Sequence, residues 1–215
     1  MPEINVFGVF MYQSLIINKI PGLFLLFLLG LTEVYAEDAL SAREVVENFQ
    51  AELIEVMKNG KELGYEGRFD KLEKPVSESH DLNMIARVVV GREWENMSSD
   101  QQEKFVEVFS RFSVAAYAHN FKEYSGESFK FESEEETGRG GVIVHTYLVI
   151  PDDKDVKFDY MLKKKGNSWR IINIIANGVS DLALRRSEYG SILKRDGYDV
   201  LIEKISEKID LYSKQ

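Results

Sequence analysis

The sequence predicts an α+β fold in which helices pack on an antiparallel meander of four strands. Two observations carry this prediction. The hydrophobic period changes from 3.6 to 2 near residue 128, so helical patterns precede the strands. Short turns separate the strands, and helical patterns return after the last of them. With 44% hydrophobic and 12% aromatic residues, the chain can build the core that such a fold requires.

Residues 1–36 predict a secretory signal peptide. Their longest apolar run, residues 22–31, would span about 15 Å as a helix, half of the roughly 30 Å that a bilayer core requires. A Val-Tyr-Ala sequence then ends the segment with the small residues typical of a cleavage site. We therefore expect export, cleavage and a single mature domain over residues 37–215. A translation start at Met11 and an uncleaved anchor from about Leu15 are the alternatives.

Helix signals come first in the mature chain. Ser41 and Glu44 form a capping box, and apolar residues then recur at helical spacing until Gly60. Asp81 can cap a second helix, which Gly91 ends. Between these helices the sequence predicts only a short amphipathic piece.

The longest predicted helix begins at Ser98 or Ser99, since either can serve as its N-cap. Its apolar face carries an unusual aromatic load. The residues of this face are Phe105, Val108, Phe109, Phe112, Ala116 and Tyr117.

Four strands follow, and two of them are apolar on both faces. The strands are expected around residues 129–131, 142–150, 156–164 and 169–176. The second and fourth do not alternate, so both of their faces need cover. Either a solid core or a pocket along one apolar side would meet this need. Hydrophobic periodicity does not distinguish the two arrangements. Two closing helices are expected from about Ser180 to Arg195 and from Tyr198 to Tyr212, with Ser180 as an N-cap.

Composition and charge exclude several classes of function. A formal net charge of -9 argues against a nucleic-acid partner and against electrostatic docking on an anionic membrane. The absence of cysteine excludes disulfides, thiolate catalysis and thiolate metal sites. The three histidines are isolated from one another and from spaced carboxylates, so no metal site and no cofactor are predicted.

Two alternatives to a binding protein remain open from the residues themselves. A curved meander packed by helices resembles the NTF2-like cone, which hosts isomerases and hydrolases that use a buried Asp or His. In this reading Asp159 and His145 would be the catalytic groups. The other alternative is a protein-interaction domain whose apolar faces are simply buried.

The segment from the last strand into the following helix carries a family resemblance. Residues 169–180, with Arg186 and Tyr189 after them, resemble the MlaC / toluene-tolerance family of periplasmic lipid-carrier proteins. The similarity extends over about residues 38–212 through ordered aromatic and glycine landmarks. Residues 178–189 are most similar to the hopanoid-biosynthesis-associated, HpnM-like branch of that family.

This resemblance implies a fold, a function and partners. It implies a cavity between sheet and helices that encloses acyl chains and leaves the headgroup at its mouth. Such proteins are soluble, non-enzymatic shuttles of an ABC-transporter-linked system that moves lipids between the inner and outer membranes. The expected ligand is a phospholipid or a hopanoid. The expected partners are a membrane-embedded ABC-transporter complex and outer-membrane proteins.

Alternation along the strands and phase along the helices select the candidate lipid-binding residues. The candidate cavity walls are Met84, Val88, Phe105, Phe109, Phe112, Phe158, Tyr160, Leu162 and Val179. The candidates for the mouth are Tyr147, Arg170 and Asn177.

Overall fold

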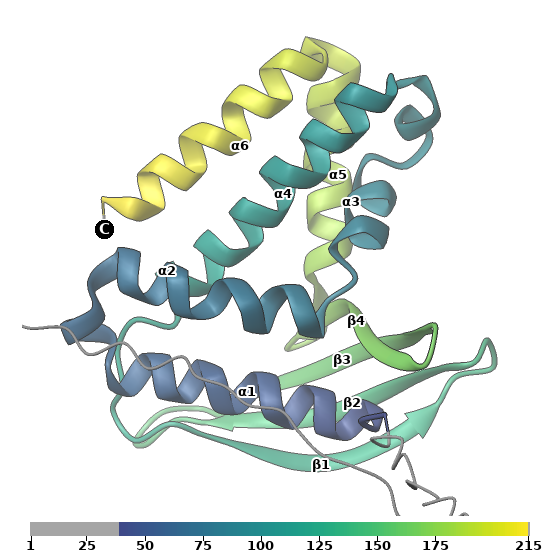
Figure 1. The fold of residues 1–215 in the computed structure, drawn as a ribbon. Coiled ribbons are helices and arrows are strands. Elements are labelled where there is room, and N and C mark those ends of the chain that lie inside the picture. The colour runs from purple at the N-terminus through teal and green to yellow at the C-terminus, as the bar shows by residue number, and fades with distance from the viewer. Residues whose placement is uncertain (1–38, 215) are drawn as a thin grey trace, which may run out of the picture. The chain divides into compact units, whose positions relative to one another are not determined.

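The computed structural model describes residues 39–214 (Figure 1). The predicted signal peptide therefore lies outside the described residues. The helices are α1 (Ala42–Lys58), α2 (Gly60–Ser79), α3 (Leu82–Val90), the 3₁₀ helix η1 (Gly91–Asn96), α4 (Ser99–Asn120), α5 (Asp181–Asp196) and α6 (Tyr198–Ser213). The strands are β1 (Ser128–Glu136), β2 (Gly141–Val149), β3 (Val156–Lys165), β4 (Ser168–Ala176) and β5 (Val179–Ser180). Over residues 39–214, no helix combines the length and apolar character needed to cross a membrane.

Local capping signals set the starts of α1 and α4 as predicted. At α1 the hydroxyl of Ser41 accepts from the backbone N–H of Glu44 at 3.2 Å, and the Glu44 carboxylate accepts in return from the N–H of Ser41 at 2.8 Å. The same reciprocal box starts α4, where Ser98 rather than Ser99 is the N-cap and Gln101 is its partner. Both boxes satisfy backbone donors that a helix start otherwise leaves free.

The segment after α1 is more helical than the sequence predicts. A short amphipathic piece was expected here, but α2 extends from Gly60 to Ser79 and includes Pro75. Gly64 interrupts it with a φ of 60°. Leu72 and Val76 of this helix are fully buried. Tertiary packing therefore outweighs the poor helix propensity of its glycines and proline.

The sheet has five antiparallel strands in sequence order, which corrects the expected count of four. Asn177 and Gly178 both have positive φ and reverse the chain tightly after β4. Val179 then pairs with Ala176 and adds the short strand β5. A two-residue strand is too short to show a hydrophobic period, which is why the sequence pattern leads directly from β4 into a helix. Ser180 still caps α5 as predicted, through a bond from the N–H of Ala183.

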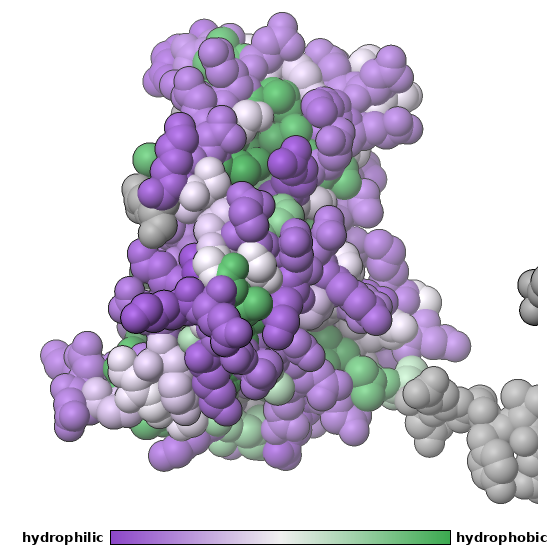
Figure 2. Space-filling view, turned by 60° about the vertical axis from the view of Figure 1, so that its left-hand side comes forward, coloured by the Kyte–Doolittle hydropathy of each residue, from purple (hydrophilic) through white to green (hydrophobic). Residues whose placement is uncertain are grey.

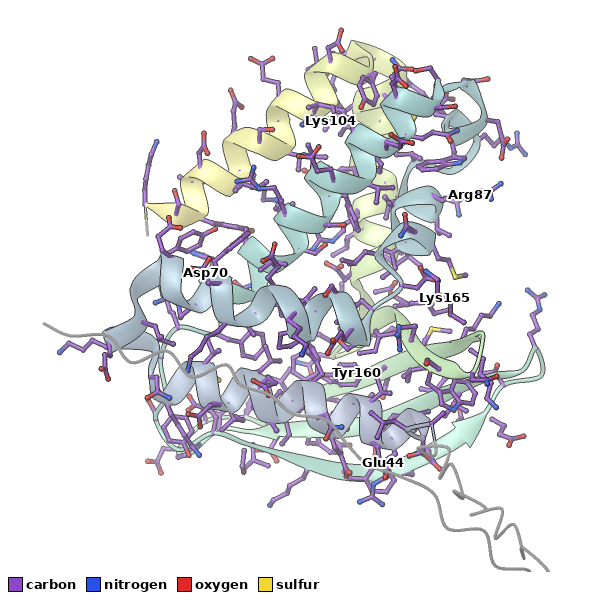
Figure 3. All side chains as sticks on the ribbon, in the orientation of Figure 1. Glu44, Asp70, Arg87, Lys104, Tyr160 and Lys165 are labelled. Atoms are coloured by element: carbon purple, nitrogen blue, oxygen red, sulfur yellow. The ribbon has the colours of Figure 1, made fainter. Side chains whose placement is uncertain are left out.

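Helices α1 and α2 lie over one face of the sheet, whereas α3 to α6 form a second group beyond them (Figure 1). On the covered face, Gln50 of α1 donates to the hydroxyl of Thr146 at 3.0 Å. Tyr160 lies on that face, between the sheet and the helices (Figure 3). The opposite face of β2 and β3 carries His145 and Asp159, which face one another across the strands.

Two apolar clusters hold the described residues together. The first joins α1, α2 and the end of α4 to the sheet. The second joins α3, α5 and α6 to the first half of α4. Because α4 belongs to both, it is the element that connects them. The outer surface is largely hydrophilic on the face shown in Figure 2, with hydrophobic side chains in small groups.

Candidate ligand pocket

A pocket of about 450 Å³ lies where the two apolar clusters meet. Strands β3 and β4 form one wall, and α3, α4 and α5 form the others. It is lined by Leu53, His80, Leu82, Ile85, Phe109, Ser113, Ala116, Tyr117, Asn120, Phe121, Phe158, Tyr160, Ile171, Ile172, Asn173, Ile174, Ala176, Val179, Asp181, Leu182, Leu184 and Arg185. Its volume is within the usual range for small-molecule sites.

One helical face of α4 supplies a continuous wall of the pocket. Phe109, Ser113, Ala116, Tyr117 and Asn120 all line it. Their spacing of three and four residues places them on the same side of the helix. The small side chains of Ser113 and Ala116 leave space beside this wall, because they fill less volume than the aromatic residues on either side of them.

The pocket reaches the surface at the corner between β5 and α5. Val179 is 52% exposed and Leu184 is 59% exposed, and both line the pocket. Apolar side chains exposed at the rim of a pocket form the kind of surface that marks a ligand-binding groove. We call this corner the mouth of the pocket.

Polar side chains at the inner end of the pocket are neutral and paired. The Nε2 atom of His80 is 3.0 Å from the Tyr117 hydroxyl, and its Nδ1 atom is 2.8 Å from the hydroxyl of Ser79. Burial lowers the pKa of His80 to about 4. Burial also raises the pKa of the Tyr117 hydroxyl well above its ordinary value. Both groups are therefore uncharged at neutral pH and do not oppose an apolar ligand.

Asp181 and Arg185 are the charged members of the pocket lining. The Nε atom of Arg185 donates to Oδ2 of Asp181 at 2.6 Å, and its guanidinium carbon lies 4.6 Å from the centre of the Phe112 ring. Burial opposes the charge of Arg185, but Asp181 and the Tyr189 hydroxyl outweigh it and raise the pKa of the guanidinium. Arg185 stays cationic at every relevant pH.

The structure places the residues predicted from the sequence in several different environments. Four of them line the pocket, namely Phe109, Phe158, Tyr160 and Val179. Three are buried but do not line it: Phe105 and Phe112 lie in the helical cluster, and Leu162 lies in the sheet cluster. Met84 and Val88 are half-buried on α3.

The predicted mouth residues lie elsewhere. Arg170 lines a second pocket, described below. Tyr147 points to the uncovered side of the sheet, where its hydroxyl donates to Glu132 at 3.4 Å. The side chain of Asn177 accepts from the backbone N–H of Lys157 at 2.9 Å and so holds the turn before β5.

Most of the residues that surround the mouth and the inner end give no signal in the sequence. Leu182, Leu184 and Arg185 come from the first turns of α5, where no pattern distinguishes them from surface residues. His80 also gave no signal, because an isolated histidine is compatible with many environments. Ile171 and Ile174 belong to β4, which is apolar on both faces. That pattern was the sign of a pocket that the sequence offered.

A second pocket of about 490 Å³ lies between α2, α4 and the adjoining ends of β3 and β4. His80 and Leu82 line both pockets, so they form a shared wall. The lining of the second pocket is much more charged, with Arg111, Lys165 and Arg170 among its members. Lys165, labelled in Figure 3, is paired with Asp81 at 2.8 Å.

The alternative catalytic pair exists as a contact but lies outside both pockets. The Nδ1 atom of His145 is 2.6 Å from Oδ1 of Asp159. Lys157 and Glu135 lie within 4 Å of the same pair, at 3.8 Å each. In the described part of the chain, no three His, Cys, Asp or Glu side chains gather in a metal-binding cluster.

Residues 47–207 match the family model described as MlaC protein. The intermembrane phospholipid transport system binding protein MlaC of Haemophilus influenzae is 28% identical over 131 residues, which cover 59% of this chain and 61% of that protein. The toluene tolerance protein ttg2D of Pseudomonas putida is 22% identical over 181 residues, which cover 82% of this chain and 84% of that protein.

A solved structure shows the same fold. It is a phospholipid-binding protein from Ralstonia solanacearum, determined in complex with a phospholipid. The TM-score is 0.71 at 15% identity, and the match covers 81% of this chain and 99% of the solved chain.

Proposed function

The chain belongs to the MlaC family, and on that premise we propose that it is a periplasmic lipid carrier of an ABC-transporter-linked system. Its pocket takes up hydrocarbon at the corner between β5 and α5 and shields it from water. The names of its relatives support transport of phospholipid, since the Haemophilus influenzae protein is named for an intermembrane phospholipid transport system. A carrier of this kind performs no chemistry on its cargo.

The observation that carries the proposal is an apolar pocket that reaches the surface. A methylene group occupies roughly the volume of a water molecule, about 30 Å³, so 450 Å³ accommodates on the order of 15 methylenes. Hiding that much hydrocarbon from water is worth about 12 kcal/mol at about 0.8 kcal/mol per methylene. One acyl chain therefore matches the pocket in size and gains enough free energy to be held there.

Release of the cargo requires that the protein and the membrane offer similar environments. The lining is dominated by aliphatic and aromatic side chains, and its histidine and tyrosine hydroxyl are neutral. Such a wall resembles the bilayer interior. The free energy of the lipid is therefore similar in the protein and in a membrane, and the lipid can pass to a membrane protein that accepts it. We infer that transfer occurs at membrane-embedded partners, because a chain of net charge -9 is repelled by anionic lipid surfaces.

Extraction of the purified protein with organic solvent, followed by mass spectrometry, tests the proposal. We expect stoichiometric lipid from protein expressed in a Gram-negative host and exported to the periplasm. A phospholipid or a hopanoid would each satisfy the carrier proposal. Protein that carries no lipid, and takes none up from vesicles, contradicts it.

Ala116→Phe is expected to reduce the bound lipid to less than half without unfolding the protein. Ala116 lines the pocket on α4, and a phenyl group there would occupy space that the ligand needs. Lipid-to-protein ratio by mass spectrometry measures the loss, and thermal unfolding verifies the fold. The matched control is Ala51→Phe, since Ala51 is exposed on α1 and does not line the pocket. If both variants carried the same amount of lipid, the lipid would not bind in this pocket.

A further inference from the structure

We propose that the shared wall, formed by His80 and Leu82, sets the longest acyl chain that the carrier accepts. This inference rests on the proposed function and adds a length limit to the cargo. Among the described residues, these two are the ones that line both pockets. The first pocket has about 450 Å³ and the second about 490 Å³, so the shared wall divides a space roughly twice as large as the first pocket.

The shared wall is attached to the sheet on one side and to α4 on the other. The backbone of His80 forms a β-bridge with Ile171 of β4, and the N–H of Asp81 donates to the Ile171 carbonyl oxygen at 3.0 Å. The ring of His80 reaches α4, where its Nε2 atom is 3.0 Å from the Tyr117 hydroxyl. The strand divides at the same point, since Ile171 lines the first pocket and Arg170 lines the second.

The ring of His80 has little freedom to move aside. Its Nδ1 atom is 2.8 Å from the hydroxyl of Ser79, so both ring nitrogens have partners. Phe49 of α1 meets the ring edge-on, with 5.0 Å between the ring centres. Only 7% of His80 is exposed. An acyl chain that displaced the ring would leave buried polar groups without partners, which is unfavourable in an apolar lining.

Leu82 completes the shared wall at the start of α3. Its side chain is half-buried and packs against both apolar clusters. Phe69 and Val114 give the second pocket an apolar part, although charged side chains line much of the rest. An acyl chain that passed the position of Leu82 would therefore meet apolar side chains in the second pocket.

An acyl chain too long for the first pocket must leave methylenes in water. The pocket accommodates on the order of 15 methylenes, which is close to the length of a palmitoyl chain. A bilayer hides every methylene, so each one that stays exposed on the protein lowers loading from a membrane by about fourfold. Loading should therefore fall steeply for chains longer than palmitoyl.

Loading from vesicles tests the length limit. Delipidated protein is equilibrated with dioleoylphosphatidylcholine vesicles that contain equal small amounts of palmitoyl, stearoyl, arachidoyl and behenoyl lysophosphatidylethanolamine. Mass spectrometry of the re-isolated protein gives the bound amount of each lysolipid relative to the vesicles. We expect the wild type to take up behenoyl lipid at least about tenfold less than palmitoyl lipid, because several of its methylenes exceed the pocket. Equal uptake of all four chains would overturn the length limit.

Leu82→Ala should remove the limit, because it opens the first pocket toward the second. We expect its uptake of behenoyl and palmitoyl lipid to agree within about threefold, since the extra methylenes then lie in the second pocket. Thermal unfolding verifies the fold. His80→Ala opens the shared wall at its other residue and should broaden the uptake in the same way, so it decides the matter if Leu82→Ala does not fold.

The matched control is Leu182→Ala. Leu182 is half-buried in the first turn of α5, as Leu82 is in α3, but it lines the first pocket alone. The substitution removes the same atoms, so the limit should move by no more than about three methylenes. Uptake of behenoyl lipid should therefore stay at least about tenfold below that of palmitoyl lipid.

The outcomes separate this inference from the proposed function. If Leu82→Ala and Leu182→Ala both bind palmitoyl lipid and have the same length profile, the carrier function stands and the shared wall does not set the limit. If the wild type takes up none of the four lysolipids, the carrier function and the length limit fail together.

Discussion

Gly60→Ala is expected to lower the free energy of unfolding by about 3 kcal/mol, the upper end of the usual cost of overpacking. Gly60 begins α2, where the backbone passes close to the end of α4. A methyl group at Gly60 would overlap the backbone carbonyl oxygen of Lys122 and approach the carbonyl carbon to 2.8 Å. A backbone carbonyl cannot rotate away as a side chain can, so one of the two segments must move.

A buried arginine makes that movement costly. Arg68 donates from Nη1 to the carbonyl oxygen of Gly60 and from Nε to that of Ala118, each at 2.8 Å. Burial lowers the pKa of Arg68 and removes water from its guanidinium. These two hydrogen bonds are therefore the main compensation for the lost hydration. A shift of α2 away from α4 would stretch at least one of them. The methyl group is therefore accommodated only by weakening the junction between α2 and α4.

Chemical denaturation of Gly60→Ala and Gly190→Ala provides the measurement. Gly190 lies inside α5 with no atom within 4 Å of the added methyl group, so alanine there should stabilise the protein by roughly 0.5–1 kcal/mol through helix propensity. The same chemical change should thus have opposite signs at the two sites. Stability changes of the same sign at both would show that the Gly60 contact relaxes freely.

The parts of the fold that were predictable are those set by local chemistry. Ser41 with Glu44 and Ser98 with Gln101 are capping boxes that work through residues three apart, so the sequence alone reveals them. The strand β5 was not predictable, because its two residues pair only through the turn at Asn177. Helix α2 was underestimated for a related reason, since its burial depends on partners far away in sequence.

The pocket was less predictable than the fold. Phe105 and Phe109 lie one turn apart on the same apolar face of α4, yet only Phe109 lines the pocket. Both are fully buried, and hydrophobic patterning reports burial rather than the presence of empty space beside a side chain. Arg185 was missed because a charged residue on an amphipathic helix is normally solvated. Its place in the lining depends on Asp181 and on the rings of α4, which only the tertiary structure brings together.

Acidification is expected to remove about 3 kcal/mol of stability through His80 alone, by the linkage between proton binding and folding. Burial lowers the pKa of His80 to about 4 in the folded protein, from the ordinary 6.5 of an exposed histidine. Between these values the unfolded chain binds a proton that the folded protein does not. The contribution is therefore complete above pH 6.5 and is lost progressively as the pH falls to 4. Each pKa unit corresponds to about 1.4 kcal/mol.

The difference between wild type and His80→Gln isolates this contribution from the other titrating groups. Burial lowers the pKa of His119 as well, and the acidic residues also titrate, but both variants share these groups. We expect the wild type to lose stability relative to His80→Gln by about 3 kcal/mol between pH 7 and pH 4, as measured by urea denaturation.

The result bears on the pocket because His80 lies in the wall between the two pockets. Its bond to Tyr117 joins α2 to α4 across that wall, and a protonated ring there would need water or a counter-ion that an apolar lining does not supply. A stability difference that stays flat with pH would mean that water already reaches the ring in the folded state. The inner end of the pocket would then be wet, and the hydrocarbon capacity deduced from its volume would be too large.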